Sequence, residues 1–144
     1  MHTDDTEGML QECDAGVKTA LDSIDAVIDR AESDELREAL KRSRTEHVQL
    51  AGEIAALLDR QGIAGKDQNG VAKMMTHTKI AAEMLLEPTD STIADLMIDG
   101  CNMGVKKLSE YINRFPNAAT PAKRISQRLI KTEQELADAM RVFL

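Results

Sequence analysis

Residues 13–18 read CDAGVK and residues 101–106 read CNMGVK, so the word Cys-x-x-Gly-Val-Lys occurs twice in a chain of 144 residues. The chain has only two cysteines and eight glycines, and the repeat uses both cysteines. Glycine inside a helix costs about 1 kcal/mol relative to alanine. The recurrence therefore needs a reason, and three are open: duplicated architecture, a redox or disulfide pair, and a thiolate metal site.

Both copies lie in patterns typical of helices, with apolar residues at spacings of three and four. The first pattern predicts a helix from about residue 5 to residue 30, and Pro116 ends the second. The first stripe is Leu10, Cys13, Val17, Leu21, Ile24, Val27 and Ile28, and the second is Ile93, Met97, Cys101, Gly104, Leu108, Ile112 and Phe115.

Each of these helices is followed by another. Ser33 is suited to be an N-cap and Gly62 to end the helix that Ser33 begins. Thr120 as N-cap and Pro121 at the first helical position predict a last helix that runs to the carboxyl terminus. The chain therefore contains two predicted helical hairpins.

The hairpins, about 5–62 and 90–144, are joined by a crossover, 63–89, with a short helical pattern at 71–86. No strand-like alternation competes. We predict one all-α domain, 1–144: a ferritin-like four-helix bundle of two duplicated hairpins, joined by a long crossover containing a short fifth helix. An up-down bundle with an extra helix is the competing topology.

The composition limits the classes of function. The formal net charge is −7, which opposes nucleic acid binding because phosphates need a basic surface. No apolar run approaches the roughly 20 residues that span a bilayer. We expect a cytoplasmic protein with reduced thiols, no nucleic acid partner and no membrane association.

The repeat itself is interpreted as a packing feature. We expect the first and fourth long patterns to cross closely at Gly16 and Gly104, with Cys13 and Cys101 as small buried apolar residues. A thiolate zinc site normally has four ligands, and neither copy has a second cysteine nearby.

His47 is the polar residue that falls in an apolar seam, one turn after Ser43. Under the duplication, the matching residue is Glu133, 86 residues later. A histidine and a carboxylate could thus meet in the bundle, with Glu46 beside them, as candidate ligands for iron, manganese or zinc. The favoured interpretation is a neutral core histidine hydrogen-bonded to a hydroxyl or a backbone carbonyl, with no metal or other cofactor, because two ligands do not make a metal site.

Ferritin-like di-iron sites need two glutamates and two Glu-x-x-His motifs. Arg44 stands three residues before His47, so the motif is absent there. No motif for a catalytic nucleophile or a phosphate loop occurs either, so no catalytic residue is predicted. Acidic side chains off the first stripe are predicted to form a solvated face: Glu12, Asp14, Asp22 and Asp25.

Methionines are concentrated in the crossover helix. Together with histidine they could bind copper(I), or suit adaptable protein contacts; the residues are Met74, Met75, His77 and Met84. The favoured interpretation is flexible core filling, because a short packing stripe is present, namely Met74, Thr78, Ala81 and Leu85.

The stretches STIADLMIDGCNMGVKKLSEYIN (91–113) and RLIKTEQELADAMRVFL (128–144) resemble small bacterial helical-bundle proteins, which look like ferritin-like domains of unknown function. The resemblance implies a ferritin-like fold and, by ancestry, a di-iron centre. The sequence leads us to expect a non-enzymatic bundle that acts through protein contacts or self-association, as a homodimer or with a protein partner. The alternative is a degenerate ferritin-like metal-binding or redox and stress protein.

Overall fold

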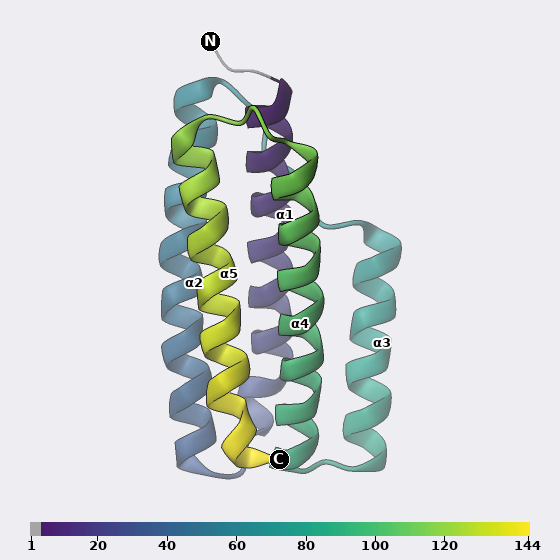
Figure 1. Cartoon of the computed structure of the whole chain (residues 1–144). Helices are drawn as coiled ribbons and strands as arrows, with labels where there is room; N and C mark the ends of the chain where they lie inside the picture. The colour runs from purple at the N-terminus through teal and green to yellow at the C-terminus, as the bar shows by residue number, and fades with distance from the viewer. Residues whose placement is uncertain (1–3) are drawn as a thin grey trace.

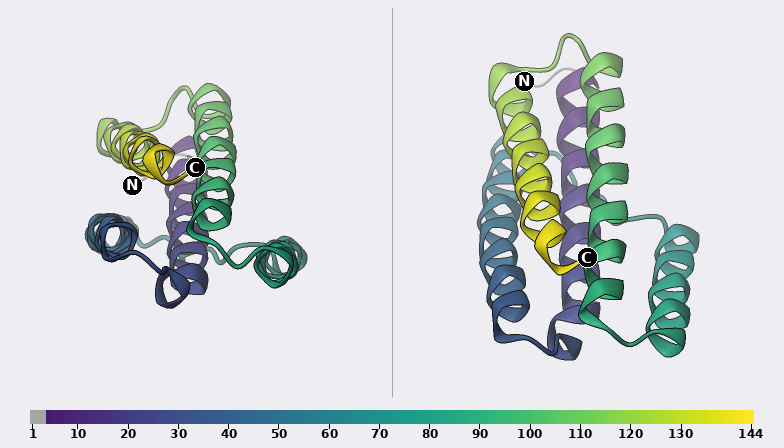
Figure 2. Two further views of the ribbon diagram at one scale, coloured as in Figure 1. Left: turned by 90° about the horizontal axis from the view of Figure 1, so that it is seen from below. Right: turned by 60° about the horizontal axis from the view of Figure 1, so that its bottom comes forward.

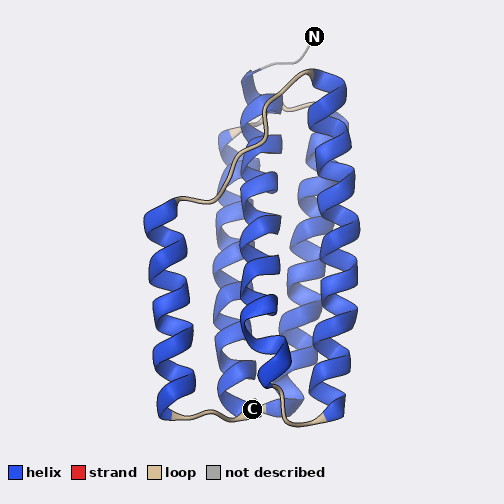
Figure 3. Cartoon of the chain, turned by 180° about the vertical axis from the view of Figure 1, so that it is seen from behind, coloured by secondary structure: helices blue, strands red, loops and turns tan. Residues whose placement is uncertain are grey.

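The structure is a computed structural model that describes residues 4–144. Within that range it contains helices and no strand (Figure 3), which confirms the all-α prediction. The helices are α1 (Asp4–Val27), α2 (Asp34–Gln61), α3 (Gly70–Leu86), α4 (Asp90–Arg114) and α5 (Thr120–Met140), and short 3-10 turns follow α1 at Ile28–Arg30 and α5 at Arg141–Phe143.

Four helices form a bundle and the fifth lies outside it. Figure 1 shows α1, α2, α4 and α5 side by side, with α3 against one flank, where it contacts α1 and α4. The view along the bundle in Figure 2 shows the same separation of α3. The pairs α1–α2 and α4–α5 are antiparallel, whereas α2 and α4 run in the same direction, so the chain between them returns along the bundle as α3.

The core is aliphatic and consists of two clusters. One cluster includes Ile24, Leu36, Leu40, Ile93, Leu136 and Met140. The other includes Leu10, Val17, Leu50, Ile54, Ile125 and Leu129. Along α2 and α5, His47 and Glu133 come between the residues of the two clusters.

Helix ends follow the predicted chemistry with one shift. The side chain of Ser33 accepts from the backbone N–H of Leu36, and Gly62 ends α2 with φ 66°, a left-handed conformation that favours glycine. Thr120 is not the N-cap of α5: the cap is Ala119, which makes no side-chain capping bond. Helix α5 therefore begins at Thr120, one residue earlier than predicted. Pro121 permits this because proline is tolerated in the first turn of a helix.

Candidate functional site

A buried histidine and a buried carboxylate meet in the middle of the bundle. His47 of α2 is 0% exposed and Glu133 of α5 is 6% exposed. Nε2 of His47 lies 2.8 Å from Oε1 of Glu133. The other ring nitrogen, Nδ1, lies 2.8 Å from the backbone oxygen of Ser43. The structure thus brings together His47, which the helical pattern placed in the seam, and Glu133, which the 86-residue offset matched to it.

The contacts of both ring nitrogens and the pKa of His47 together assign the protons of this pair. Because a carbonyl oxygen only accepts, Nδ1 of His47 donates to Ser43. A second proton must then lie between Nε2 and Glu133. Burial lowers the pKa of His47, but the hydrogen bond and charge of Glu133, with the bond to Ser43, outweigh it and raise the pKa above its ordinary value. We therefore describe the pair as an imidazolium that donates to a carboxylate.

Glu46 does not complete a metal site with this pair. It is half-buried and affects His47 through its charge. In the part of the chain that the structure describes, no group of three or more His, Cys, Asp or Glu side chains could hold a metal ion. The residues considered for copper(I) also diverge, since Met74 is 71% exposed while Met84 is buried on the other side of α3.

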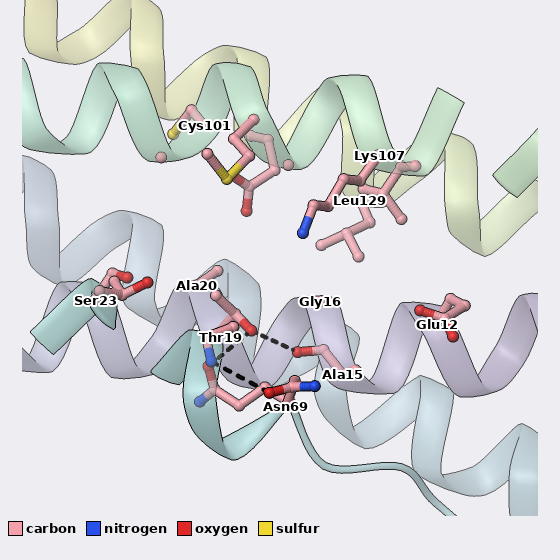
Figure 4. Close-up of a pocket in the computed structure, with 18 of the residues that line it drawn as sticks. Glu12, Ala15, Gly16, Thr19, Ala20, Ser23, Asn69, Cys101, Lys107 and Leu129 are labelled. Carbon is pink, nitrogen blue, oxygen red and sulfur yellow. Dashed lines mark hydrogen bonds between the residues drawn. The ribbon is translucent and has the colours of Figure 1, made fainter. Parts of the chain in front are cut away.

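A cavity of about 440 Å³ lies next to Glu133, between α1, α3 and α4 (Figure 4). Small residues of α1 and α4 form much of its wall, namely Ala15, Gly16, Ala20, Gly100 and Gly104. Helix α5 contributes Leu129, Glu133 and Leu136. Figure 4 shows Lys107 of α4 pointing toward α1 across this cavity. The space exists because α3 stands away from the bundle and the facing helices carry small side chains.

Gly16 and Gly104 line this cavity, and the predicted close crossing of helix backbones at these residues is not what the structure shows. A Cβ atom at Gly16 would meet a leucine methyl group at 3.9 Å, and one at Gly104 would meet Oε2 of Glu133 at 3.4 Å. These are ordinary contacts with side chains. The tightly packed glycines are Gly8, where a Cβ would lie 2.6 Å from the ring of Phe115, and Gly65, where it would lie 2.8 Å from Oδ2 of Asp14.

The two cysteines are buried free thiols. Sγ of Cys13 lies 3.0 Å from Oγ of Ser126. Burial is the main reason that the pKa of Cys13 is raised to about 11, although the bond to Ser126 lowers it. Burial, then the charge and hydrogen bond of Glu133, raise the pKa of Cys101. Neither thiol forms a thiolate near neutral pH, so neither has the reactivity of a redox or nucleophilic cysteine.

The acidic face of α1 holds the loop between α2 and α3. Asp14 is 6% exposed and accepts from the backbone N–H of Lys66 at 2.8 Å and from Nζ of Lys18 at 2.9 Å. Lys18 also bonds Asp67 at 2.9 Å. The prediction of a solvated face is wrong for Asp14, because a helical pattern does not show which loop covers a polar face, whereas Asp25 is exposed. The other acidic residues of this face also form side-chain hydrogen bonds: Glu12 with Lys66, Asp22 with Gln68 and Asp25 with Arg44.

Helix α3 has two apolar sides. Ile80 and Met84 are buried against the bundle. Eight exposed residues without charge recur at spacings of three and four on the opposite side, and we call them the outer face of α3: Val71, Met74, Met75, Thr78, Ala81, Ala82, Leu85 and Leu86. The predicted packing stripe lies on this outer face, so its interpretation as core filling within one chain is wrong.

Comparisons with known proteins point to a fold. No protein-family model matches the chain, and no curated protein matches it. A solved structure that is similar is the crystal structure of a DUF305 fragment from Deinococcus radiodurans, a domain of unknown function. Its TM-score is 0.77 at 15% sequence identity, and the match covers 98% of this chain and 95% of that one. At this identity, the likeness shows a shared helical fold.

Proposed function

We propose that the protein is a non-enzymatic helical bundle that acts through protein contacts, by pairing with a second copy of itself through the outer face of α3. The observation that carries this proposal is the exposure of that face. Met74 is 71% exposed and Leu85 and Leu86 are each 83% exposed. Apolar faces of a helix are normally buried, and in one chain only one of the two apolar sides of α3 is covered.

Charge favours a second copy over a membrane as the occupant of this face. Both lysines of α3 pair with carboxylates of the bundle: Lys73 with Asp22 at 3.3 Å and Lys79 with Asp99 at 3.7 Å. The outer face is therefore uncharged, on a chain of net charge −7. Helices that lie on anionic lipid usually carry basic residues beside their apolar face. In the range 4–144, no helix is both long and apolar enough to cross a membrane.

The distribution of large and small side chains along the outer face of α3 suits a symmetric pair of helices. Val71, Met74 and Met75 are bulky at one end, Leu85 and Leu86 are bulky at the other, and the middle carries small residues. In an antiparallel pair related by a twofold axis, the bulky end of one helix meets the bulky end of its partner, and small residues meet at the crossing. Such an interface is self-complementary, as twofold interfaces are.

Sedimentation equilibrium tests the proposal. The mass of the wild-type protein is expected to rise from 15.8 kDa toward twice that value with concentration. Thr78→Glu puts a charge in the middle of the face and should keep the protein monomeric. Val48→Glu, at a half-exposed apolar position on α2 far from α3 (Figure 1), is the matched control and should still pair. A wild-type protein that stays monomeric at about 1 mM contradicts the proposal.

The alternative function, a degenerate ferritin-like metal-binding or redox protein, draws support from the contact between His47 and Glu133. The residues fit a metal poorly, because Ser43 and Glu133 already engage both ring nitrogens. Stoichiometric iron, manganese or zinc in protein purified without a tag would favour this alternative.

Ferritin-like ancestry and internal duplication belong to the same proposal about origin. They draw support from two antiparallel hairpins joined by a long crossover (Figure 1), and from Gly16 and Gly104, which lie at matching positions of the repeated word and line one cavity. The cytoplasmic and bacterial assignments stay predictions.

A further inference from the structure

We propose that the cavity between α1, α3 and α4 is a binding site for a small, largely apolar organic molecule that donates a hydrogen bond to Glu133. This inference is independent of pairing through α3. The cavity of about 440 Å³ lies within the usual size range of ligand pockets.

The apolar character of the site comes from side chains of α1, α4 and α5. Ile24, Met97, Leu108 and Leu129 line it together with the small residues already named. Room for a ligand exists beside Gly100, since a Cβ atom there would meet no atom within 4 Å. An apolar guest gains from leaving water in proportion to the area that it buries.

The polar character of the site comes from Glu133, which selects the chemistry of the ligand. Its Oε1 atom accepts from His47, and its Oε2 atom lies beside Gly104, at the cavity wall. An ionised carboxylate has about four acceptor positions and no donor. A ligand group that reaches Oε2 must therefore donate, as a hydroxyl or an N–H does, while an ether oxygen in the same place would be repelled.

Polar side chains stand where the cavity opens to solvent. Figure 4 shows Glu12 and Asn69 at its edge and Lys107 across it. The loop before α3 and the first turns of α3 close the remaining side with Gln68, Ala72 and Thr76. A ligand would thus lie with its donor toward Glu133 and its apolar body between α1 and α4.

Two probes of the same shape test the site: 2-naphthol, which can donate a hydrogen bond, and 2-methoxynaphthalene, which cannot. Titration calorimetry on the full chain should give saturable binding of 2-naphthol and binding of the ether weaker by about tenfold, the effect of losing one charge-assisted hydrogen bond. Equal affinity for both probes overturns the role of Glu133.

Matched leucine substitutions locate the binding. Gly100→Leu fills the cavity, whereas Gly52→Leu makes the same change on the exposed surface of α2, where a Cβ also meets no atom within 4 Å. Gly52→Leu should bind 2-naphthol like the wild type, and Gly100→Leu at least tenfold more weakly. Ala20→Leu fills the cavity from the opposite wall, and it replaces Gly100→Leu in the experiment if that variant does not fold. Binding that survives both fillings, or no saturable binding to the wild type, overturns the proposal.

Discussion

His47 and Glu133 place two charges inside an aliphatic bundle, where either charge without the other would strongly destabilise the fold. Removing charges from water costs several kcal/mol for each ion, and a buried pair recovers this only with good geometry and further hydrogen bonds. The 2.8 Å contact and the bond from Nδ1 to Ser43 supply both. The pair therefore holds α2 and α5 in one register. Removing either residue would leave the charge of the other buried and unpaired.

The raised pKa of His47 predicts a pH dependence of stability. The folded state holds the proton more tightly than the unfolded chain does. The stabilisation is thus complete below the unfolded pKa of about 6.5 and is lost as the pH rises through the raised folded value. Denaturant unfolding of the wild type and of Glu133→Gln should differ by about 1.5–3 kcal/mol near pH 5.5, and the difference should shrink at higher pH. A difference that does not change up to about pH 9 would show that the proton is not shared as described.

The contact of these two residues could be foreseen, whereas the role of the glycines could not. A helical pattern with a period of 3.6 shows which residues face inward, so it placed His47 in the seam, and the 86-residue offset between the hairpins matched Glu133 to it. It does not show how far away the neighbouring helix lies. Gly16 and Gly104 line a cavity, where a Cβ would make ordinary contacts with side chains, whereas a Cβ at Gly8 would clash with the ring of Phe115. Only the packed structure distinguishes these two reasons for a small residue.

The loop between α2 and α3 is held by α1, and Asp14 is the centre of that attachment. Asp14→Asn removes the charge that attracts Lys18 and weakens the bond to the backbone of Lys66. A hydrogen bond to a charged group contributes about 1.5–3 kcal/mol, so we expect trypsin to cut after Lys66 about tenfold faster or more, with little change in the melting temperature of the bundle.

A second carboxylate of α1 provides the control for this experiment. Asp25 pairs with Arg44 of α2 at 2.6 Å, away from the loop. Asp25→Asn should leave the rate of cleavage after Lys66 unchanged. Equal rates for Asp14→Asn and the wild type would mean that the loop is held by other contacts.

Helix α3 shows what a helical pattern cannot decide when an element has two apolar sides. Its residues at 71–86 predict a helix, and α3 spans Gly70–Leu86. The stripe through Met74 was the obvious packing side, yet the side of Ile80 and Met84 packs against the bundle. Periodicity cannot choose between two apolar sides of one helix, because each satisfies the pattern equally well.

The whole molecule tolerates much sequence change because its core needs only aliphatic side chains of about the right size at helical spacing. The chain has 2% aromatic residues and two aliphatic clusters. A structure with 15% sequence identity still aligns with a TM-score of 0.77. Volume and patterning suffice to specify such a fold, which is why the all-α bundle could be predicted. The exposure of one apolar side of α3 could not be predicted from the pattern.

Disulfide crosslinking at the middle of the outer face tests pairing through α3 most directly. Thr78→Cys places a thiol near the expected twofold axis, and the natural cysteines do not interfere because both are buried. Under mild oxidation, Thr78→Cys should form a covalent dimer rapidly, while Val48→Cys on α2 should form one slowly or not at all. Equal rates for the two variants, or no covalent dimer of Thr78→Cys at concentrations where the wild type is expected to pair, would contradict association through the outer face of α3.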